Sequence, residues 1–94
     1  MDVSEDLLGK AGVMEIIREF KQTDDPQSVE MLTESVSVSS STVRNRLDEL
    51  VEAGILAEDA DLIDDRPTRV YLLTDSGQKV AETLQTLDEA LSGE

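Results

Sequence analysis

Hydrophobic residues recur at helical spacing near the start of the chain. They are Leu7, Leu8, Ala11, Met14, Ile16, Ile17 and Phe20. Their three- and four-residue intervals predict a first helix from about Ser4 to Lys21. The turn-forming segment TDDP follows at 23–26. Ser28 then has the character of an N-cap, and it predicts a short helix that carries Val29, Leu32 and Val36 on one face.

A second helix is predicted directly after this short one. Ser39 can cap it, and it should run over about Ser40–Ala53 until Gly54 ends it. Its hydrophobic positions are Val43, Leu47, Leu50 and Val51. Two helices joined by a turn of three or four residues form a helix-turn-helix.

The remainder of the chain predicts a β-hairpin followed by a long helix. Ile55–Ile63 and Thr68–Leu73 have strand composition, and a polar tip at 64–67 separates them. The hairpin, about Ile55–Leu73, would form a wing. Thr74 can cap a last helix whose hydrophobic positions are Val80, Leu84, Leu87 and Leu91. We therefore expect an α+β, mainly helical fold, a winged helix-turn-helix with a three-helix core, a two-stranded β wing and a C-terminal helix, as one domain over residues 1–94.

Composition excludes several classes of function. The chain has no Cys and no His, so it offers no disulfide, no thiol sensor and no zinc site. It also lacks histidine, the commonest general base in enzymes. We expect neither an enzyme nor a bound cofactor. The N-terminal segment lacks the charge and hydrophobic run of a signal peptide, and no segment reaches the ~18 apolar residues of a membrane span. These features predict a cytoplasmic protein with no membrane partner.

The chain is strongly acidic. It has 22 Asp and Glu against eight Lys and Arg, a net charge of −14, and only three Lys. Repulsion among these carboxylates opposes folding in dilute buffer, whereas concentrated salt screens it. This composition resembles that of proteins from haloarchaeal and other salt-accumulating cells; an acidic protein from an ordinary cell is the alternative.

Half of the positive charges lie in the two longest segments without carboxylates. Residues 35–47 carry Arg44 and Arg46, and residues 66–74 carry Arg66 and Arg69. Surfaces cleared of carboxylates in such an acidic chain favour a negatively charged partner, and double-stranded DNA is the first candidate.

The predicted second helix of the helix-turn-helix has a polar face suited to DNA. With its hydrophobic residues buried, Ser41, Asn45, Asp48 and Glu52 point outward. An Asn amide can pair with the edge of adenine, and Arg44 and Arg46 would flank Asn45, toward phosphates or guanine. Hydroxyls and N–H groups at the helix start suit a phosphate, and the residues that supply them are Ser39, Ser40 and Ser41. In the alternative, both arginines are solvated and Arg44 pairs with Asp48.

Nearby carboxylates limit this interface. Asp48, Glu49 and Glu52 should share the outward side of the helix, so that only its first two turns can enter a groove. On the wing, Arg66 and Arg69 either follow a minor groove and its phosphates or are neutralised by the adjacent acids at 64 and 65.

The two ends of the chain predict an interface between protomers. Hydrophobic residues of the terminal helices exceed what the domain core requires, and a homodimer would bury them. The residues expected in this seam are Val3, Leu7, Val80, Leu84, Leu87 and Leu91. The alternative is that the stripe packs only on its own domain.

Three segments resemble the winged helix-turn-helix transcriptional regulators of the HxlR and MarR groups. They are VSSSTVRNRLDELVEAGIL, RPTRVYLLTDSGQKV and LLGKAGVMEII. The resemblance covers almost the whole chain and implies a sequence-specific regulator that binds DNA as a symmetric dimer. Ala11 stands where HxlR-type proteins often have Trp, and without Cys their thiol-based signalling does not carry over. A protein-interaction module or acidic DNA mimic is the alternative function, and any small-molecule effector stays open.

Overall fold

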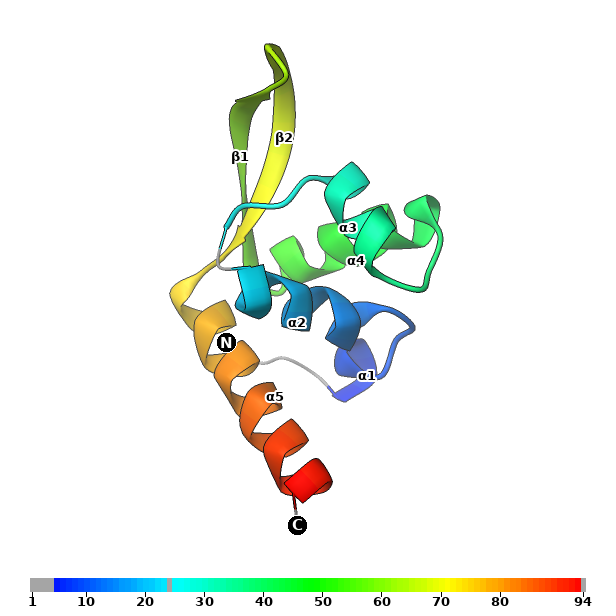
Figure 1. Ribbon diagram of the computed structural model, residues 1–94, viewed down its shortest axis with the longest axis vertical. Helices are drawn as coiled ribbons and strands as arrows, with labels where there is room; N and C mark the ends of the chain where they lie inside the picture. The colour runs from blue at the N-terminus through cyan, green and yellow to red at the C-terminus, as the bar shows by residue number, and fades with distance from the viewer. Residues whose placement is uncertain (1–4, 24, 94) are drawn as a thin grey trace.

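The computed structural model describes residues 5–23 and 25–93, which form an elongated body of 46 × 27 × 23 Å. The wing lies at one end of the long axis and the last helix at the other, with the other helices between them (Figure 1). In chain order the elements are α1 (Glu5–Leu8), α2 (Val13–Thr23), α3 (Val29–Ser35), α4 (Ser40–Glu52), β1 (Leu56–Ile63), β2 (Arg66–Leu73) and α5 (Asp75–Gly93). The predicted fold class, a mainly helical winged helix-turn-helix, is confirmed.

Side-chain caps begin three of the helices where the sequence predicts them. The Ser28 Oγ accepts a hydrogen bond from the Met31 N–H at 3.3 Å, and the Ser39 Oγ accepts one from the Thr42 N–H at 3.3 Å. The Thr74 Oγ1 accepts one from the Gly77 N–H at 3.0 Å. Each oxygen satisfies a backbone donor that lacks a partner in the first helical turn, which fixes the starts of α3, α4 and α5.

The predicted first helix from Ser4 to Lys21 is wrong as a single element, because it is two helices separated by a turn at residues 9–12. Gly12 has φ +89°, a backbone conformation that interrupts an α-helix and favours glycine. A Cβ on Gly12 would lie 2.8 Å from a methyl group of Val38, so this turn also packs closely against the turn between α3 and α4. The hydrophobic spacing continues through the break and conceals it.

The wing is a tighter hairpin than predicted. The prediction placed Arg66 and Pro67 in the tip, but they pair with Ile63 and Leu62 in an antiparallel ladder. Asp64 and Asp65 alone form the turn, with φ +52° and +63°, which is the geometry of a two-residue type I′ turn. β1 begins at Leu56 rather than Ile55.

Two N–H groups of β1 that do not face β2 are occupied by side chains of the strand itself. Within the described residues β1 pairs with β2 alone, whereas β2 makes a further bridge from Tyr71 to Gln27. On β1, the Asp59 Oδ1 accepts from the Ala60 N–H and the Asp61 Oδ1 accepts from the Leu62 N–H, both at 2.8 Å. Alternate N–H groups along the strand are thus occupied by carboxylates.

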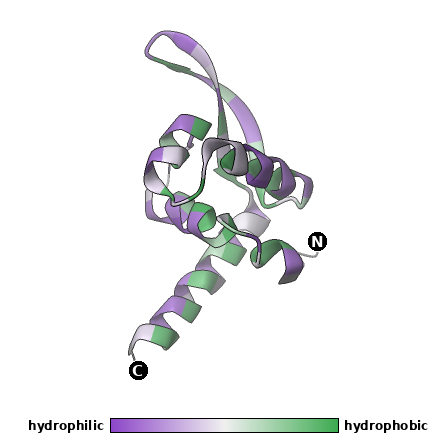
Figure 2. Ribbon diagram, turned by 90° about the vertical axis from the view of Figure 1, so that its right-hand side faces the viewer, coloured by the Kyte–Doolittle hydropathy of each residue, from purple (hydrophilic) through white to green (hydrophobic). Residues whose placement is uncertain are grey.

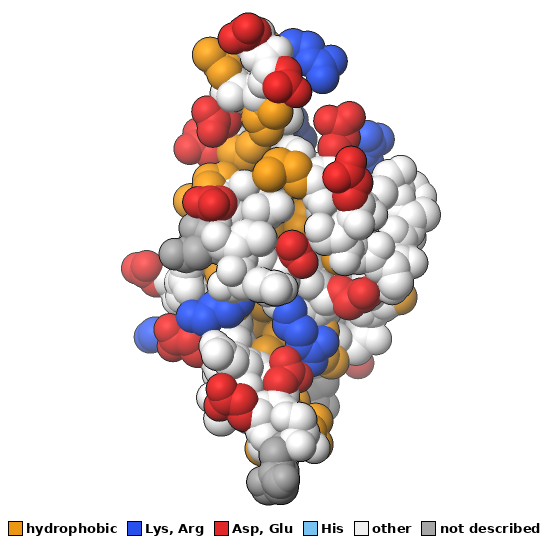
Figure 3. All heavy atoms as spheres, in the orientation of Figure 1, with side chains coloured by type: hydrophobic (Ala, Val, Ile, Leu, Met, Phe, Trp, Pro, Cys, Tyr) orange, Lys and Arg blue, Asp and Glu red, His pale blue; other side chains and the backbone are white. Residues whose placement is uncertain are grey.

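One hydrophobic core joins the helices to the base of the wing. Hydrophobic and hydrophilic segments alternate along the helices (Figure 2). Helices α2 and α4 supply most of the fully buried side chains, which are Val13, Ile16, Ile17, Leu32, Val43, Leu47, Leu50 and Ile55. An ion pair adds to the attachment of α5, because the Arg18 guanidinium donates to both carboxylate oxygens of Asp88 at 2.8 Å. Positive side chains are visible at the wing tip, at the right-hand side and at the level of α2 and α5, and acidic side chains are scattered between them over this face (Figure 3).

Gly77 controls how closely α5 approaches the body, so we expect Gly77→Ala to destabilise the protein. A Cβ there would lie 2.1 Å from the Ile55 carbonyl oxygen, a backbone atom that cannot rotate away. Overpacking of this kind should cost about 2–3 kcal/mol, which lowers the melting temperature by roughly 10–20 °C in a domain of this size. Thermal unfolding followed by circular dichroism measures the change. Ser76→Ala is the neighbouring control, and an equal effect of both variants would contradict the steric argument.

Candidate nucleic-acid interface

Helix α4 has the two faces that the sequence predicts. Val43, Leu47 and Leu50 are fully buried, while Asn45 and Asp48 are exposed. Because the core fixes one face, the polar side chains of the other project away from the body. The Asn45 amide makes no hydrogen bond within the described part of the chain, so both its donor and its acceptor remain for an external partner.

The start of α4 is exposed and lined with hydroxyls. Ser39, Ser40 and Ser41 are all exposed, and the Ser39 Oγ lies 3.2 Å from the Ser41 Oγ and 3.1 Å from the Thr42 Oγ1. Ser39 is engaged as the cap, which leaves the hydroxyls of Ser40 and Ser41 nearer to solvent. Backbone N–H groups and the positive end of the helix dipole at this point suit an anionic group such as a phosphate.

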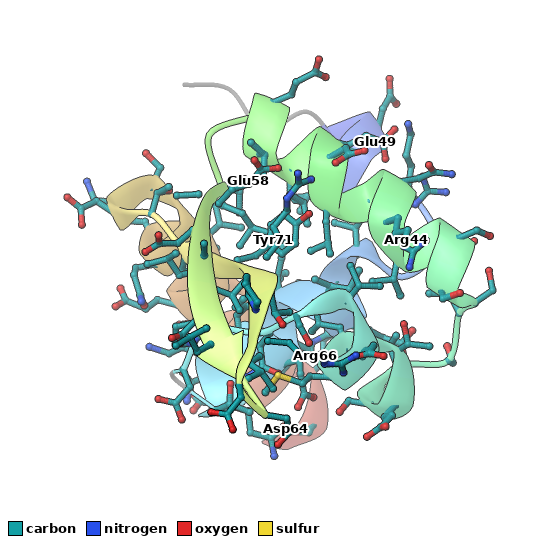
Figure 4. The ribbon with its side chains drawn as sticks, turned by 90° about the horizontal axis from the view of Figure 1, so that it is seen from above. Arg44, Glu49, Glu58, Asp64, Arg66 and Tyr71 are labelled. Carbon is teal, nitrogen blue, oxygen red and sulfur yellow. The ribbon has the colours of Figure 1, made fainter. Side chains whose placement is uncertain are left out.

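Arg44 borders a hollow of about 560 Å³ that the wing, α3 and α4 enclose. Seen from above, Arg44 projects from α4 and Arg66 from the wing (Figure 4). The alternative prediction of an Arg44–Asp48 ion pair finds no support, since no carboxylate of the described residues lies within 4.0 Å of Arg44 as a salt-bridge partner. The same hollow is lined by Glu30, Glu34 and Asp64, so positive and negative groups share it.

Arg46 lies in a different environment from the one predicted. Its Nε donates to the Ala11 carbonyl at 3.0 Å, and its Nη1 donates to the Glu49 Oε1 at 2.9 Å. Only 20% of the side chain is exposed. Glu49 is also not the outward-facing carboxylate that the sequence predicts, because it lies between Arg46 and Lys10. These contacts turn Arg46 toward the α1–α2 turn and away from Asn45.

The two arginines of the wing differ from each other. The Arg69 Nη1 lies 3.9 Å from the Glu58 Oε2 across the hairpin. A hydrogen bond to the Tyr71 side chain, followed by the Glu58 charge, raises the pKa of Arg69 above its usual value. Arg66 is exposed and has no salt-bridge partner among the described residues. The alternative in which the acids at 64 and 65 neutralise the two arginines finds no salt bridge among the described residues, and the ion pair that does occur is between Arg69 and Glu58.

Comparisons with known proteins identify the family of the chain. Residues 7–93 match the family model described as HxlR-like helix-turn-helix. The chain belongs to this family. A comparison with curated protein sequences finds no match.

Solved structures include close structural neighbours of this HxlR-like protein. A possible HxlR family transcriptional factor from Thermoplasma volcanium is 27% identical, with a TM-score of 0.79 over 98% of this chain and 84% of that one. The reduced form of the transcriptional regulator YodB from B. subtilis is 26% identical, with a TM-score of 0.69 over 94% and 87%. The MepR A103V mutant from S. aureus, at 16% identity, shares the fold, with a TM-score of 0.75 over 93% and 62%. The HxlR-like protein is thus a DNA-binding transcriptional regulator.

The residues predicted for the dimer seam are divided by the structure. Three of them pack in or against the core of their own domain; these are Leu7, Val80 and Leu84. For Val80 and Leu84 this is the alternative in which the stripe of the last helix packs on its own domain. Leu87 and Leu91, farther along α5, are 46% and 77% exposed. Val3 lies outside the described residues. In residues 5–23 and 25–93, no helix has the length and apolar character to cross a membrane.

Contacts of the α1–α2 turn were missed by sequence reasoning. Lys10 forms an ion pair with Glu49, and the Ser37 Oγ donates to the Glu15 Oε1 at 2.7 Å. These partners are 39 and 22 residues apart, so local spacing carries no signal for them. The one local signal was the pair of glycines at 9 and 12, which marks a turn.

Proposed function

We propose that this HxlR-like regulator binds DNA as a symmetric homodimer, with α4 of each protomer in successive major grooves. The observation that supports this most directly is the exposed Asn45, with Arg44 beside it, on the first turns of α4. No carboxylate precedes Asp48 on that helix. Half-sites would lie about one helical turn, roughly 34 Å, apart.

In this arrangement base and phosphate contacts come from different residues. The Asn45 amide would pair with the N6 and N7 edge of an adenine, which distinguishes that base from the other three. Arg44 would reach a phosphate or a guanine edge. The start of α4, with Ser40 and Ser41, would hold a backbone phosphate.

The wing would contribute affinity more than specificity. Arg66, near the tip and exposed, would approach phosphates beside the minor groove. Arg69 would contribute less, because the Glu58 carboxylate lies 3.9 Å from its guanidinium.

The carboxylates near this interface favour a role in concentrated salt. Glu30, Glu34 and Asp64 line the same hollow as Arg44 and would repel phosphates in dilute buffer. At about 1 M salt the Debye length falls to roughly 3 Å, and this repulsion is largely screened. Together with the net charge of −14, this supports a halophilic, cytoplasmic regulator.

The dimer would form through the terminal helices. Leu87 and Leu91 lie on the part of α5 that extends beyond the core (Figure 1), and both side chains are exposed. A second copy of the chain would cover them, because a symmetric pair of α5 helices brings the same stripe from both protomers together. The family membership does not favour the protein-interaction or DNA-mimic alternative.

Asn45→Ala and Arg66→Ala should weaken DNA binding in different ways. Loss of Asn45 should cost about 1–3 kcal/mol at one base position and relax the preference there. Loss of Arg66 should weaken binding to all sequences evenly and reduce the slope of log affinity against log salt by about 1. Selection of duplexes from random-sequence DNA, followed by binding titrations across a KCl series, measures both effects. If Asn45→Ala left the selected sequence unchanged, Asn45 would not contact a base.

A further inference from the structure

The α1–α2 turn is fastened to the middle of the recognition helix by a charged network. Lys10 pairs with the Glu49 Oε2, and the Arg46 Nη1 donates to the Glu49 Oε1 at 2.9 Å. Arg46 closes the network through its Nε, which donates to the Ala11 carbonyl at 3.0 Å. Both carboxylate oxygens of Glu49 and two of the three guanidinium nitrogens of Arg46 are therefore used inside the protein.

The network is partly shielded from solvent. The side chains of Arg46, Glu49 and Lys10 are 20%, 30% and 44% exposed. The hydrogen bond from Lys10 lowers the pKa of Glu49; desolvation opposes this, and Arg46 adds to it. Glu49 is thus held in its charged form, and a charged acceptor makes stronger hydrogen bonds than a neutral one.

The same N-terminal segment also contacts the turn that precedes the recognition helix. The Ser37 Oγ and backbone N–H donate to the Glu15 carboxylate at 2.7 and 3.3 Å. Gly12 approaches Val38 so closely that a Cβ would have no room. Residues 10–15 therefore hold α4 both before its start and at its third turn.

We infer that Arg46 and Glu49 are positioning residues, which fix the recognition helix on the α1–α2 turn. Helix α2, which follows that turn, is tied to α5 by the Arg18–Asp88 ion pair, so the network also sets the separation of the two recognition helices in a dimer that meets through α5. The inference rests on the proposed function. If Glu49 acted only through its charge, it would weaken DNA binding, since a carboxylate on the recognition helix repels phosphate. The geometry assigns it a favourable effect on DNA binding that acts through Arg46 and Lys10.

Glu49→Gln tests this inference by the sign of its effect. A positioning role predicts that affinity for a duplex selected by the wild-type protein falls about fivefold or more. The matched control is Asp48→Asn, which removes an exposed carboxylate from the adjacent position of the same helix. Asp48→Asn should raise affinity about 1.5- to 5-fold, because it only reduces repulsion. All binding is measured in one KCl concentration, well below each variant's melting temperature.

Arg46→Lys separates positioning from phosphate contact. Lysine keeps the positive charge, but a single ammonium group cannot reproduce two directed bonds from different nitrogens of a planar guanidinium. Arg46→Lys should therefore lose nearly as much affinity as Arg46→Met. Full retention of affinity in Arg46→Lys would instead make Arg46 a phosphate contact.

The spacing of the half-sites supplies a readout that simple loss of stability would not change. If the network sets the separation of the recognition helices, Glu49→Gln should lose affinity for two half-sites at the selected spacing, and less for one half-site alone. A rise in affinity with Glu49→Gln, as in Asp48→Asn, would overturn the inference while leaving the proposed function intact. Failure of the wild type to prefer any selected duplex over random DNA would instead overturn the proposed function.

Discussion

Replacement of Leu87 or Leu91 by glutamate is expected to convert the dimer into monomers while leaving α5 helical. Both side chains are exposed in the protomer, so a carboxylate there costs the isolated fold little. At a symmetric seam each substitution places a carboxylate against the partner's hydrophobic stripe. The two introduced carboxylates, one from each protomer, also lie close to each other. Four leucines, two from each protomer, would lose their burial. Complete burial of an exposed leucine contributes about 1.5–3 kcal/mol, and Leu87, which is 46% exposed in the protomer, contributes about half of that.

The loss of the dimer should also remove most of the DNA affinity. A dimer that engages two half-sites gains on the order of 10²–10⁴ in affinity over a single contact, so Leu91→Glu should lose about that factor without any change at α4. Sedimentation velocity at tens of micromolar protein gives the oligomeric state, and circular dichroism gives the helical content. Thr86→Glu, which adds the same charge on an exposed position outside the stripe, is the control. A wild-type protein that sediments as a monomer would refute the seam.

The melting temperature should rise steeply with KCl. The net charge of −14 is confined to a body with a radius of gyration of 13.1 Å, whereas an unfolded chain of this length spreads to roughly 30 Å. Treating both states as charged spheres in water, we expect that raising KCl from about 0.1 to 2 M relieves on the order of 4 kcal/mol of repulsion in the folded state relative to the unfolded one. The melting temperature should therefore rise by roughly 15–30 °C.

The salt effect has an internal control. Glu30, Glu34 and Glu89 are exposed and form no salt bridge within the described residues. The triple variant with Gln at these positions should be more stable at 0.1 M KCl and show a flatter rise. Unfolding is followed at constant protein concentration, because dimerisation also changes the melting temperature. A flat profile in the wild type would remove the halophilic interpretation.

Local chemistry was sufficient to predict the positions of most elements. Ser28, Ser39 and Thr74 each act within three residues of themselves, so their caps follow from the sequence. The break at Gly12 was not predicted, because the hydrophobic residues before and after it follow one helical spacing in the sequence, although the helix is interrupted between them. Two aspartates in succession at 64 and 65 closed the hairpin earlier than turn composition suggested, since both adopt positive φ.

The side-chain positions of the candidate site were predictable only where the geometry of a single helix, α4, determines them. The exposure of Asn45 and Asp48 follows from the burial of Val43 and Leu47 on the opposite face. The position of Arg46 depends on a carbonyl 35 residues away, and helical geometry contains no information about that partner. For the same reason Leu84 and Leu87 look equivalent in the stripe, yet the contact between α2 and α5 buries one and leaves the other exposed.

The aspartates along the outer edge of β1 have a consequence for self-association. A strand edge with unoccupied N–H groups can recruit an extended segment of another molecule and so start aggregation. In this wing, Asp59 and Asp61 occupy two of those donors, the N–H groups of Ala60 and Leu62, and add negative charge beside them. An incoming strand would have to displace two carboxylates and then lie against them. The wing can therefore stand away from the body at the high protein concentrations of a crowded cell while offering an incoming strand few free partners for β-aggregation.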